Sequence, residues 1–273
     1  MKRWARTALL LLAVAGLIYA GVVFLENRFI YFPARAITAT PADSGLDFED
    51  VYFSTGDDVR LHGWWIAGDA DRPTLLWFHG NGGNLSDRVE IFAKVHDEIG
   101  VGIFAIDYRG YGRSEGSPSE DGLYADAAAA LETVIAWTDT ESTDVVAVGQ
   151  SLGSAVAVEL ATDHELAGVV LEAPFTSVPD MARHHYSPLP VALLLRTGFN
   201  TKSKIGGIGA PLLVVHGQED DIVPVDMGRE VYDAAPEPKV FEVIAGAGHN
   251  DIFLSEAYLG ILQAFLEDLE RSG

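Results

Sequence analysis

The chain has 273 residues, 48% of them hydrophobic, which is enough to bury the core of one large α/β domain or two small ones. It contains no cysteine, so its chemistry cannot use disulfides, thiolate metal sites or a cysteine nucleophile. A formal net charge of −22 leaves no basic surface for phosphate groups, and we therefore expect no nucleic-acid partner.

The first predicted element is an N-terminal membrane anchor within residues 1–28. A basic segment at 1–6 precedes an uncharged apolar stretch at 8–25, which is close to the minimum length of a membrane-spanning helix. A cleaved signal peptide is the alternative interpretation. Because the basic residues come first, the positive-inside rule predicts a single-pass membrane protein. The rest of its chain would lie on the non-cytoplasmic side, periplasmic or extracellular.

Beyond the anchor we expect a linker at 29–45 and one domain at 46–273, in which strands and helices alternate. The predicted strands are 48–54, 59–66, 74–78, 101–106, 144–149, 167–171, 211–215 and 239–244, and the predicted helices are 85–99, 119–137, 152–163, 225–234 and 251–270. Short, unbroken apolar strands between helices predict a mainly parallel, doubly wound sheet that is covered on both faces. Ligands of such a sheet bind at the carboxyl ends of its strands.

Residues 174–206 interrupt this alternation, and we expect them to form a short lid insert over that end of the sheet. The apolar residues 191–195 either line an acyl pocket or pack against the core. His184 and His185 of the insert can contact the substrate, whereas His216 is interpreted as a packed turn residue.

The strongest chemical signal is a serine in the sequence VVAVGQSLGSAV at 145–156. Ser151 lies between a predicted buried strand and a predicted helix, with Gly149 and Gly153 two residues away on either side. A sharp strand-to-helix turn holds the central hydroxyl clear of the sheet, and only small neighbours fit where strand and helix approach each other. We therefore predict that Ser151 is a nucleophile; the alternative is a turn serine that caps the helix.

A serine nucleophile needs a base, and the base needs a carboxylate that holds it in one tautomer. His249, in GAGHND, follows the last predicted strand, where its ring can reach the strand ends; its alternative role is a helix cap. Asp220, in HGQEDDIVP, follows the preceding strand, with Asp221 as second choice and Glu172 as a more remote one. The chain order Ser151, Asp220, His249 is the nucleophile–acid–base order of one fold in particular.

The sequence LLWFHGNGGN at 75–84 leaves the first strand of the parallel run. A tight turn at His79-Gly80 lets the backbone N–H of Asn81 face Ser151, where it would form an oxyanion hole together with the N–H of Leu152. A plain glycine-rich turn is the alternative. A phosphate-binding loop is excluded because no Lys-Ser/Thr pair follows the glycines.

Taken together, these motifs resemble those of α/β-hydrolases, and specifically of the Bem46-like membrane-anchored serine hydrolases. The stretches that carry the resemblance are FHGNGGN (78–84), IDYRGYGRSEGSPSEDGLYAD (106–126), GQSLGS (149–154), LEAPFTS (171–177), HGQEDDIVP (216–224) and GAGHND (246–251). The resemblance implies an α/β-hydrolase fold with the triad Ser151, Asp220 and His249. It also implies an oxyanion hole at Asn81 and Leu152.

The loop with Asp107, Arg109 and Tyr111 is typical of the family, and we interpret it as mainly structural. The expected activity is hydrolysis of an ester or thioester through an acyl-enzyme, without metal or organic cofactor. The expected partners are a small-molecule or acylated substrate and, through the N-terminal helix, the membrane. A serine peptidase of the same fold and a non-catalytic binding protein are the alternatives.

Overall fold

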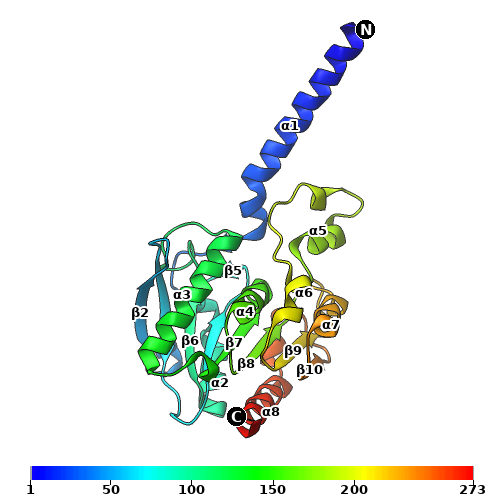
Figure 1. Ribbon diagram of the computed structural model, residues 1–273. Helices are drawn as coiled ribbons and strands as arrows, with labels where there is room; N and C mark the ends of the chain where they lie inside the picture. The colour runs from blue at the N-terminus through cyan, green and yellow to red at the C-terminus, as the bar shows by residue number, and fades with distance from the viewer. Residues whose placement is uncertain (1, 273) are drawn as a thin grey trace.

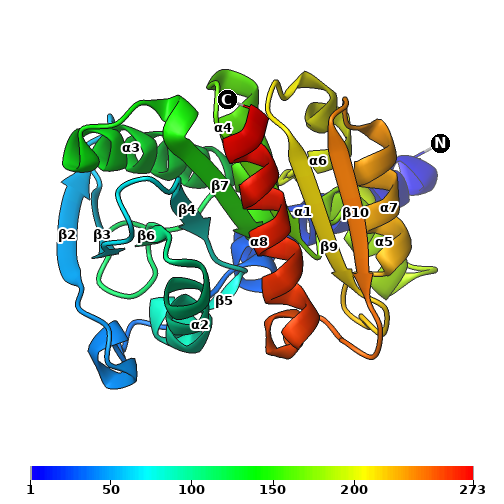
Figure 2. The ribbon, with the colours of Figure 1, turned by 90° about the horizontal axis from the view of Figure 1, so that it is seen from below.

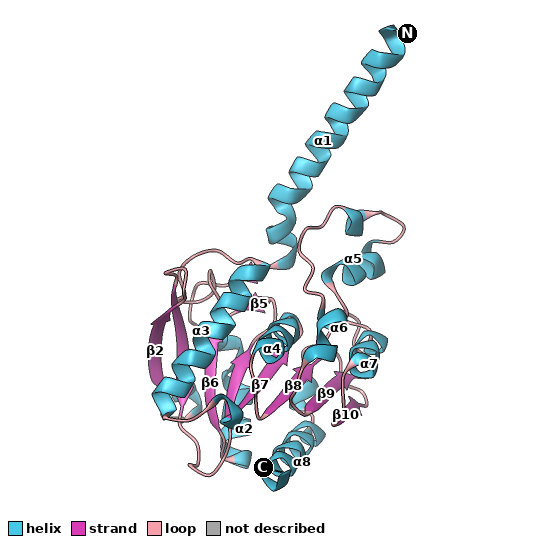
Figure 3. Cartoon of the chain, in the orientation of Figure 1, coloured by secondary structure: helices cyan, strands magenta, loops and turns pink. Residues whose placement is uncertain are grey.

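Eight strands form one twisted sheet in this computed structural model, which describes residues 2–272. They are β2 (Glu49–Ser54), β3 (Arg60–Ile66), β4 (Thr74–Phe78), β6 (Gly102–Asp107), β7 (Val145–Gln150), β8 (Gly168–Glu172), β9 (Leu212–Gly217) and β10 (Lys239–Ile244). Their order in space is β10-β9-β8-β7-β4-β6-β3-β2. The β2–β3 and β3–β6 pairs are antiparallel and all other pairs are parallel, so the predicted mainly parallel sheet is confirmed (Figure 3).

Each central strand is buried on both faces, which explains why its sequence shows no alternation of apolar and polar residues. Leu76 and Phe78 of β4 join the core on one face of the sheet, and Leu75 and Trp77 join the core on the other. Helices α3 (Glu120–Thr138), α4 (Leu152–Asp163) and α7 (Val225–Ala234) cover the first face, and α2 (Val89–Ile99) and α8 (Glu256–Ser272) cover the second (Figure 2). The sheet is therefore the middle layer of three.

The predicted helices 152–163 and 225–234 have the bounds of α4 and α7, and the largest differences for the other predicted helices lie at their starts. Ser119 caps α3 as expected, because its Oγ accepts a hydrogen bond from Gly122 N at 3.2 Å. The predicted helix at 85–99 begins instead as a 3₁₀ turn, η2 (Leu85–Arg88), whose cap is Asn84. The last predicted helix also begins with a separate 3₁₀ turn, η6 (Ile252–Leu254).

An N-terminal helix, α1 (Lys2–Ile30), extends away from the sheet (Figure 1). Within the part of the chain that the structure describes, no helix is both long enough and apolar enough to cross a membrane. The transmembrane anchor predicted at 1–28 is therefore not confirmed. Several side chains of that segment, including those at 22–24, lie outside the described residues. The predicted non-cytoplasmic location and the domain division stay predictions.

The segment that follows α1 is bound to the domain. Its short strand β1 (Phe32–Pro33) pairs in parallel with β5 (Gly82–Gly83), which belongs to the glycine-rich loop after β4. Asn84 adds two side-chain hydrogen bonds to this segment, donating to the carbonyl of Ala34 at 3.1 Å and to that of Ala36 at 2.7 Å. Part of the predicted linker at 29–45 therefore supports the loop that is expected to hold the oxyanion.

The insert at 174–206 connects β8 to β9 and contains α5 (Val178–Tyr186), η4 (Val191–Leu193) and α6 (Thr201–Lys204). Figure 1 shows α5 beside the end of α1 that joins the domain. This arrangement brings the two segments together where the parallel strands end.

Candidate active site

Ser151 lies at the turn between β7 and α4, in a strained backbone conformation with φ 51° and ψ −111°. The glycines around it are required by close backbone contacts. A methyl group at Gly153 would lie 2.0 Å from the carbonyl oxygen of Phe78, and one at Gly149 would lie 2.3 Å from that of Gly153. Ser151 N donates to the carbonyl of Glu172 at 2.8 Å. The G-x-S-x-G pattern thus lets the helix cross close over the sheet and raises the serine above the strand ends.

His249 and Asp220 form a hydrogen-bonded pair, with 2.7 Å between His249 Nδ1 and Asp220 Oδ2. The Asp220 side chain is fully buried, and its Oδ1 accepts backbone hydrogen bonds from Ile222 N at 2.9 Å and Val223 N at 2.7 Å. With Nδ1 donating to this carboxylate, Nε2 of the neutral ring is free to accept a proton.

Burial alone would raise the pKa of Asp220. Hydrogen bonds from His216 and His249 outweigh that effect and hold the pKa well below its ordinary value. The carboxylate is therefore ionised at neutral pH, and its charge can stabilise a protonated His249.

The two other candidate acids lie elsewhere. Asp221 is exposed. Glu172 is buried at the end of β8, where it accepts a hydrogen bond from Tyr258, and burial raises its pKa to about 7. The structure thus brings Asp220, and neither of the alternatives, into contact with the histidine.

His216 is a supporting residue that the sequence interpretation did not identify. Its fully buried ring places Nε2 at 3.3 Å from Asp220 Oδ2 and at 2.9 Å from the carbonyl of Val223. It lies at the end of β9, four residues before Asp220. That position at a strand end was the available signal, although position alone does not distinguish a partner of the acid from a packed turn residue.

Asn81 is held on three sides. Its carbonyl accepts hydrogen bonds from Phe32 N at 2.9 Å and Tyr111 Oη at 2.8 Å, and its side-chain amide donates to the carbonyl of Ile30 at 3.0 Å. None of these contacts uses its backbone N–H. A methyl group at the neighbouring Gly80 would lie 3.7 Å from Ser151 Cβ, so the loop passes directly beside the serine. Leu152 is the first residue of α4, and its N–H has no acceptor within the helix.

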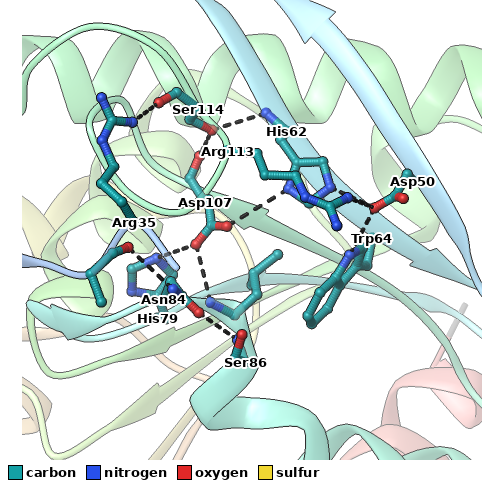
Figure 4. Close-up of polar contacts among 12 residues, drawn as sticks. Arg35, Asp50, His62, Trp64, His79, Asn84, Ser86, Asp107, Arg113 and Ser114 are labelled. Atoms are coloured by element: carbon teal, nitrogen blue, oxygen red, sulfur yellow. Dashed lines mark hydrogen bonds and ion pairs between the residues drawn. The ribbon is translucent and has the colours of Figure 1, made fainter. Parts of the chain in front are cut away.

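A polar cluster around the buried Asp107, His79 and His62 fastens both ends of this loop to the end of β6 (Figure 4). Asp107 Oδ1 accepts from Leu85 N at 3.1 Å, and the carbonyl of Asp107 accepts from Ser114 Oγ at 2.6 Å. His79 lies 3.6 Å from the same carboxylate, and burial lowers its pKa to about 4, so it is neutral at physiological pH. His62 continues the cluster to Asp50, with 2.7 Å between Nε2 and Oδ1.

Arg109, from the loop that follows β6, is paired on two sides. It donates from Nε to Asp126 at 2.9 Å and from Nη1 to Asp57 at 2.9 Å. Its contacts are thus internal ion pairs, which agrees with the expected structural role of this loop.

A pocket of about 940 Å³ opens where these elements meet. It brings together Ser151, His249, Asn81 and Leu152, while Asp220 lies behind His249. Most of its wall is apolar and comes from α1 and the insert: Leu25, Phe29, Ile30, Phe175, Val178, Met181, Ala182, Val191 and Leu195. Of the two histidines of the insert for which a substrate contact was predicted, His185 lines this pocket and His184 does not. Among the described residues, no group of three or more His, Asp or Glu side chains could hold a metal ion.

A mainly parallel sheet with a strained serine after β7, an aspartate after β9 and its paired histidine after β10 defines an α/β-hydrolase. Comparisons with known proteins agree. The Hydrolase_4 family model, described as serine aminopeptidase S33, matches residues 69–197. An uncharacterized protein of Mycobacterium tuberculosis is 37% identical over 250 residues, covering 89% of each chain. Protein bem46 of Schizosaccharomyces pombe is 30% identical over 92% of this chain and 89% of its own.

The fold also matches the solved structure of the Pyrococcus furiosus esterase Pf2001. The TM-score is 0.73 and the sequence identity 22%, over 88% of this chain and 97% of the esterase. The chain belongs to the α/β-hydrolases, in the family that includes protein bem46.

Proposed function

We propose that this hydrolase cleaves an ester or thioester through a covalent acyl-enzyme on Ser151. The observation that carries the proposal is the His249–Asp220 pair, 2.7 Å apart, beside a strained serine that lines the same pocket as the histidine. A serine hydroxyl becomes nucleophilic only with such an oriented base.

In the proposed reaction, Ser151 Oγ attacks the carbonyl carbon of the substrate while His249 Nε2 takes the hydroxyl proton. The carbonyl oxygen becomes an oxyanion and accepts hydrogen bonds from the backbone N–H groups of Asn81 and Leu152. The intermediate collapses, the C–O or C–S bond breaks, and protonated His249 gives its proton to the departing alcohol or thiol. Water then attacks the acyl-enzyme by the same route and releases the acid.

The apolar wall of the pocket supports an acyl substrate. Its volume of about 940 Å³ lies near the upper end of the ~300–1,000 Å³ typical of small-molecule sites. We propose that the insert acts as the lid of this pocket, because Val178, Met181 and Leu195 line it.

A serine peptidase is the second candidate, since the matching family model is described as a serine aminopeptidase. An aminopeptidase needs a free carboxylate to bind the substrate's ammonium group. Glu26 and Asp87, the acidic residues that line the pocket in the described chain, already accept backbone hydrogen bonds from Arg196, Thr197 and Asn84. These bonds hold both carboxylates in place, and it is the mostly apolar wall of the pocket that favours the esterase or thioesterase.

The direct test is labelling with a fluorophosphonate, which reacts only with an activated serine. We expect one adduct on the wild-type protein by intact mass, located on Ser151 by peptide mapping, and none on Ser151→Ala. An adduct of equal yield on the variant would show that another residue reacts, and the assignment of Ser151 would be wrong.

A further inference from the structure

Two helices from distant parts of the chain line the pocket. Gly21, Leu25 and Phe29 follow one another at intervals of four residues on α1, so they share one face of that helix, and all three line the pocket. On α5, Val178 and Met181 are likewise separated by one helical turn and line the pocket. In Figure 1, α5 and the domain end of α1 lie at the same end of the sheet, and both line the pocket.

The α1 side of this pocket is incompletely covered. Phe29 is 66% exposed and Leu25 is 37% exposed, although both line the cavity that contains Ser151. An apolar ligand that continues from the serine would remove this surface from water, which is favourable in proportion to the area buried. Because the wall is hydrocarbon and continuous with the reacting centre, the ligand that fits is the acyl chain of the substrate itself.

Glu26 holds the two walls together. It is only 5% exposed, and its Oε1 accepts hydrogen bonds from the backbone N–H groups of Arg196 and Thr197 in the insert, both at 2.7 Å. Bonds from two N–H groups to one carboxylate are charge-assisted and fix the position of the segment that donates them. Four residues later, the carbonyl of Ile30 accepts from Asn81 of the oxyanion loop.

We propose that Gly21, Leu25, Glu26, Phe29 and Ile30 of α1 are part of the substrate-binding site. Leu25 and Phe29 bind the acyl chain, and Glu26 is a positioning residue that keeps the insert over it. The proposal rests on the acyl transfer proposed above and adds the residues that set acyl-chain preference. A helix expected from sequence to act only as a tether would thus determine specificity.

The test compares kcat/KM for p-nitrophenyl dodecanoate and p-nitrophenyl butyrate, using the full chain in one detergent buffer. For Phe29→Ala and Leu25→Ala we expect the dodecanoate-to-butyrate ratio to fall about tenfold, because the long chain loses apolar contact that the short chain does not make. Leu9→Ala is the matched control, since Leu9 is exposed on the same helix and does not line the pocket. Its ratio should equal that of the wild type.

Glu26 is tested by two substitutions. Glu26→Leu removes the acceptor and should raise KM for the dodecanoate several-fold more than it lowers kcat, whereas Glu26→Gln keeps a carbonyl acceptor and should restore most of that KM. The proposal would be overturned if Phe29→Ala, Leu25→Ala and Glu26→Leu changed kcat/KM equally for both esters. It would also be overturned if Leu9→Ala changed the dodecanoate-to-butyrate ratio as much as they do.

Fluorophosphonate labelling of every variant separates this proposal from the one on which it rests. If the wild-type protein neither labels nor cleaves either ester, the proposed function is wrong. If the wild-type protein is labelled but the dodecanoate-to-butyrate ratio of kcat/KM is unchanged in all variants, only the acyl-site proposal is wrong.

Discussion

Asp220 and Asp221 are chemically identical neighbours, and their surroundings give them different roles. Asp220 is buried, accepts two backbone hydrogen bonds and contacts two histidines, while Asp221 is exposed. A carboxylate can orient a catalytic imidazole only if it is itself held in place. The difference between the two aspartates therefore gives a sharp comparison.

We expect Asp220→Asn to lower kcat for p-nitrophenyl butyrate by about 10³–10⁴, because an amide cannot hold His249 in the required tautomer or stabilise its cation. Asp221→Asn is the matched control and should retain kcat within about twofold, as expected for an exposed side chain. Steady-state kinetics with circular dichroism as a folding check would measure both. The reverse order of effects would assign the acid to Asp221.

The turn from β7 to α4 is the element on which the serine depends, and its glycines are matched to backbone contacts. We expect Gly153→Ala to destabilise the protein by more than about 2 kcal/mol, because the new methyl group would overlap the carbonyl of Phe78. Gly260→Ala in α8 meets no atom within 4 Å, so it should stabilise the helix by about 0.5–1 kcal/mol. Urea unfolding measures the free energy of unfolding of both variants. An unchanged value for Gly153→Ala would show that β4 and α4 can separate without cost.

Strand β8 and helix α8 are joined through Glu172 and Tyr258, and this contact predicts a pH dependence of stability. Burial, partly offset by the Tyr258 hydrogen bond and by Arg88, raises the pKa of Glu172 from 4.5 to about 7. The folded protein then retains a proton that the unfolded chain has already lost. The contribution of Glu172 to the free energy of unfolding is therefore full below pH 4.5 and is lost as the pH rises through about 7.

Glu172→Gln should remove this dependence while keeping an acceptor for Tyr258. As the pH rises from about 4 to above 7, we expect the free energy of unfolding of the wild type to fall by roughly 3 kcal/mol relative to that of the variant. Urea unfolding at several pH values measures that difference. A constant difference across this range would mean that Glu172 titrates normally.

For the molecule as a whole, the large excess of acidic residues sets the electrostatic behaviour. The net charge is −22, so the acidic side chains repel one another in the compact folded state. Added salt screens this repulsion. We expect Tm at pH 7 to rise by several degrees when NaCl increases from about 10 mM to about 0.5 M, where the Debye length is short. A Tm that falls over this range would show that internal ion pairs, such as Arg109 with Asp126, outweigh the net repulsion.

The sequence alone was sufficient to predict the eight strands of the large sheet, the helices that cover it and the mainly parallel arrangement of the strands. It also singled out Ser151, Asp220 and His249, whose catalytic roles stay predictions. These inferences depend on local signals: short apolar runs, glycines at a tight turn, and loops directly after strands. Such signals can be recognised in a sequence because backbone geometry and burial constrain a few consecutive residues at a time.

The tertiary structure decided what no local signal carries. It placed His216 against Asp220, paired the predicted linker with the glycine-rich loop, and made the end of α1 a wall of the pocket, fastened to the insert by Glu26. Except for that of His216 with Asp220, these contacts join segments that are far apart in the sequence and meet only when the whole domain packs. The residues concerned look ordinary in sequence, since a buried histidine, a linker and an apolar helix acquire these roles only from the elements that fold against them.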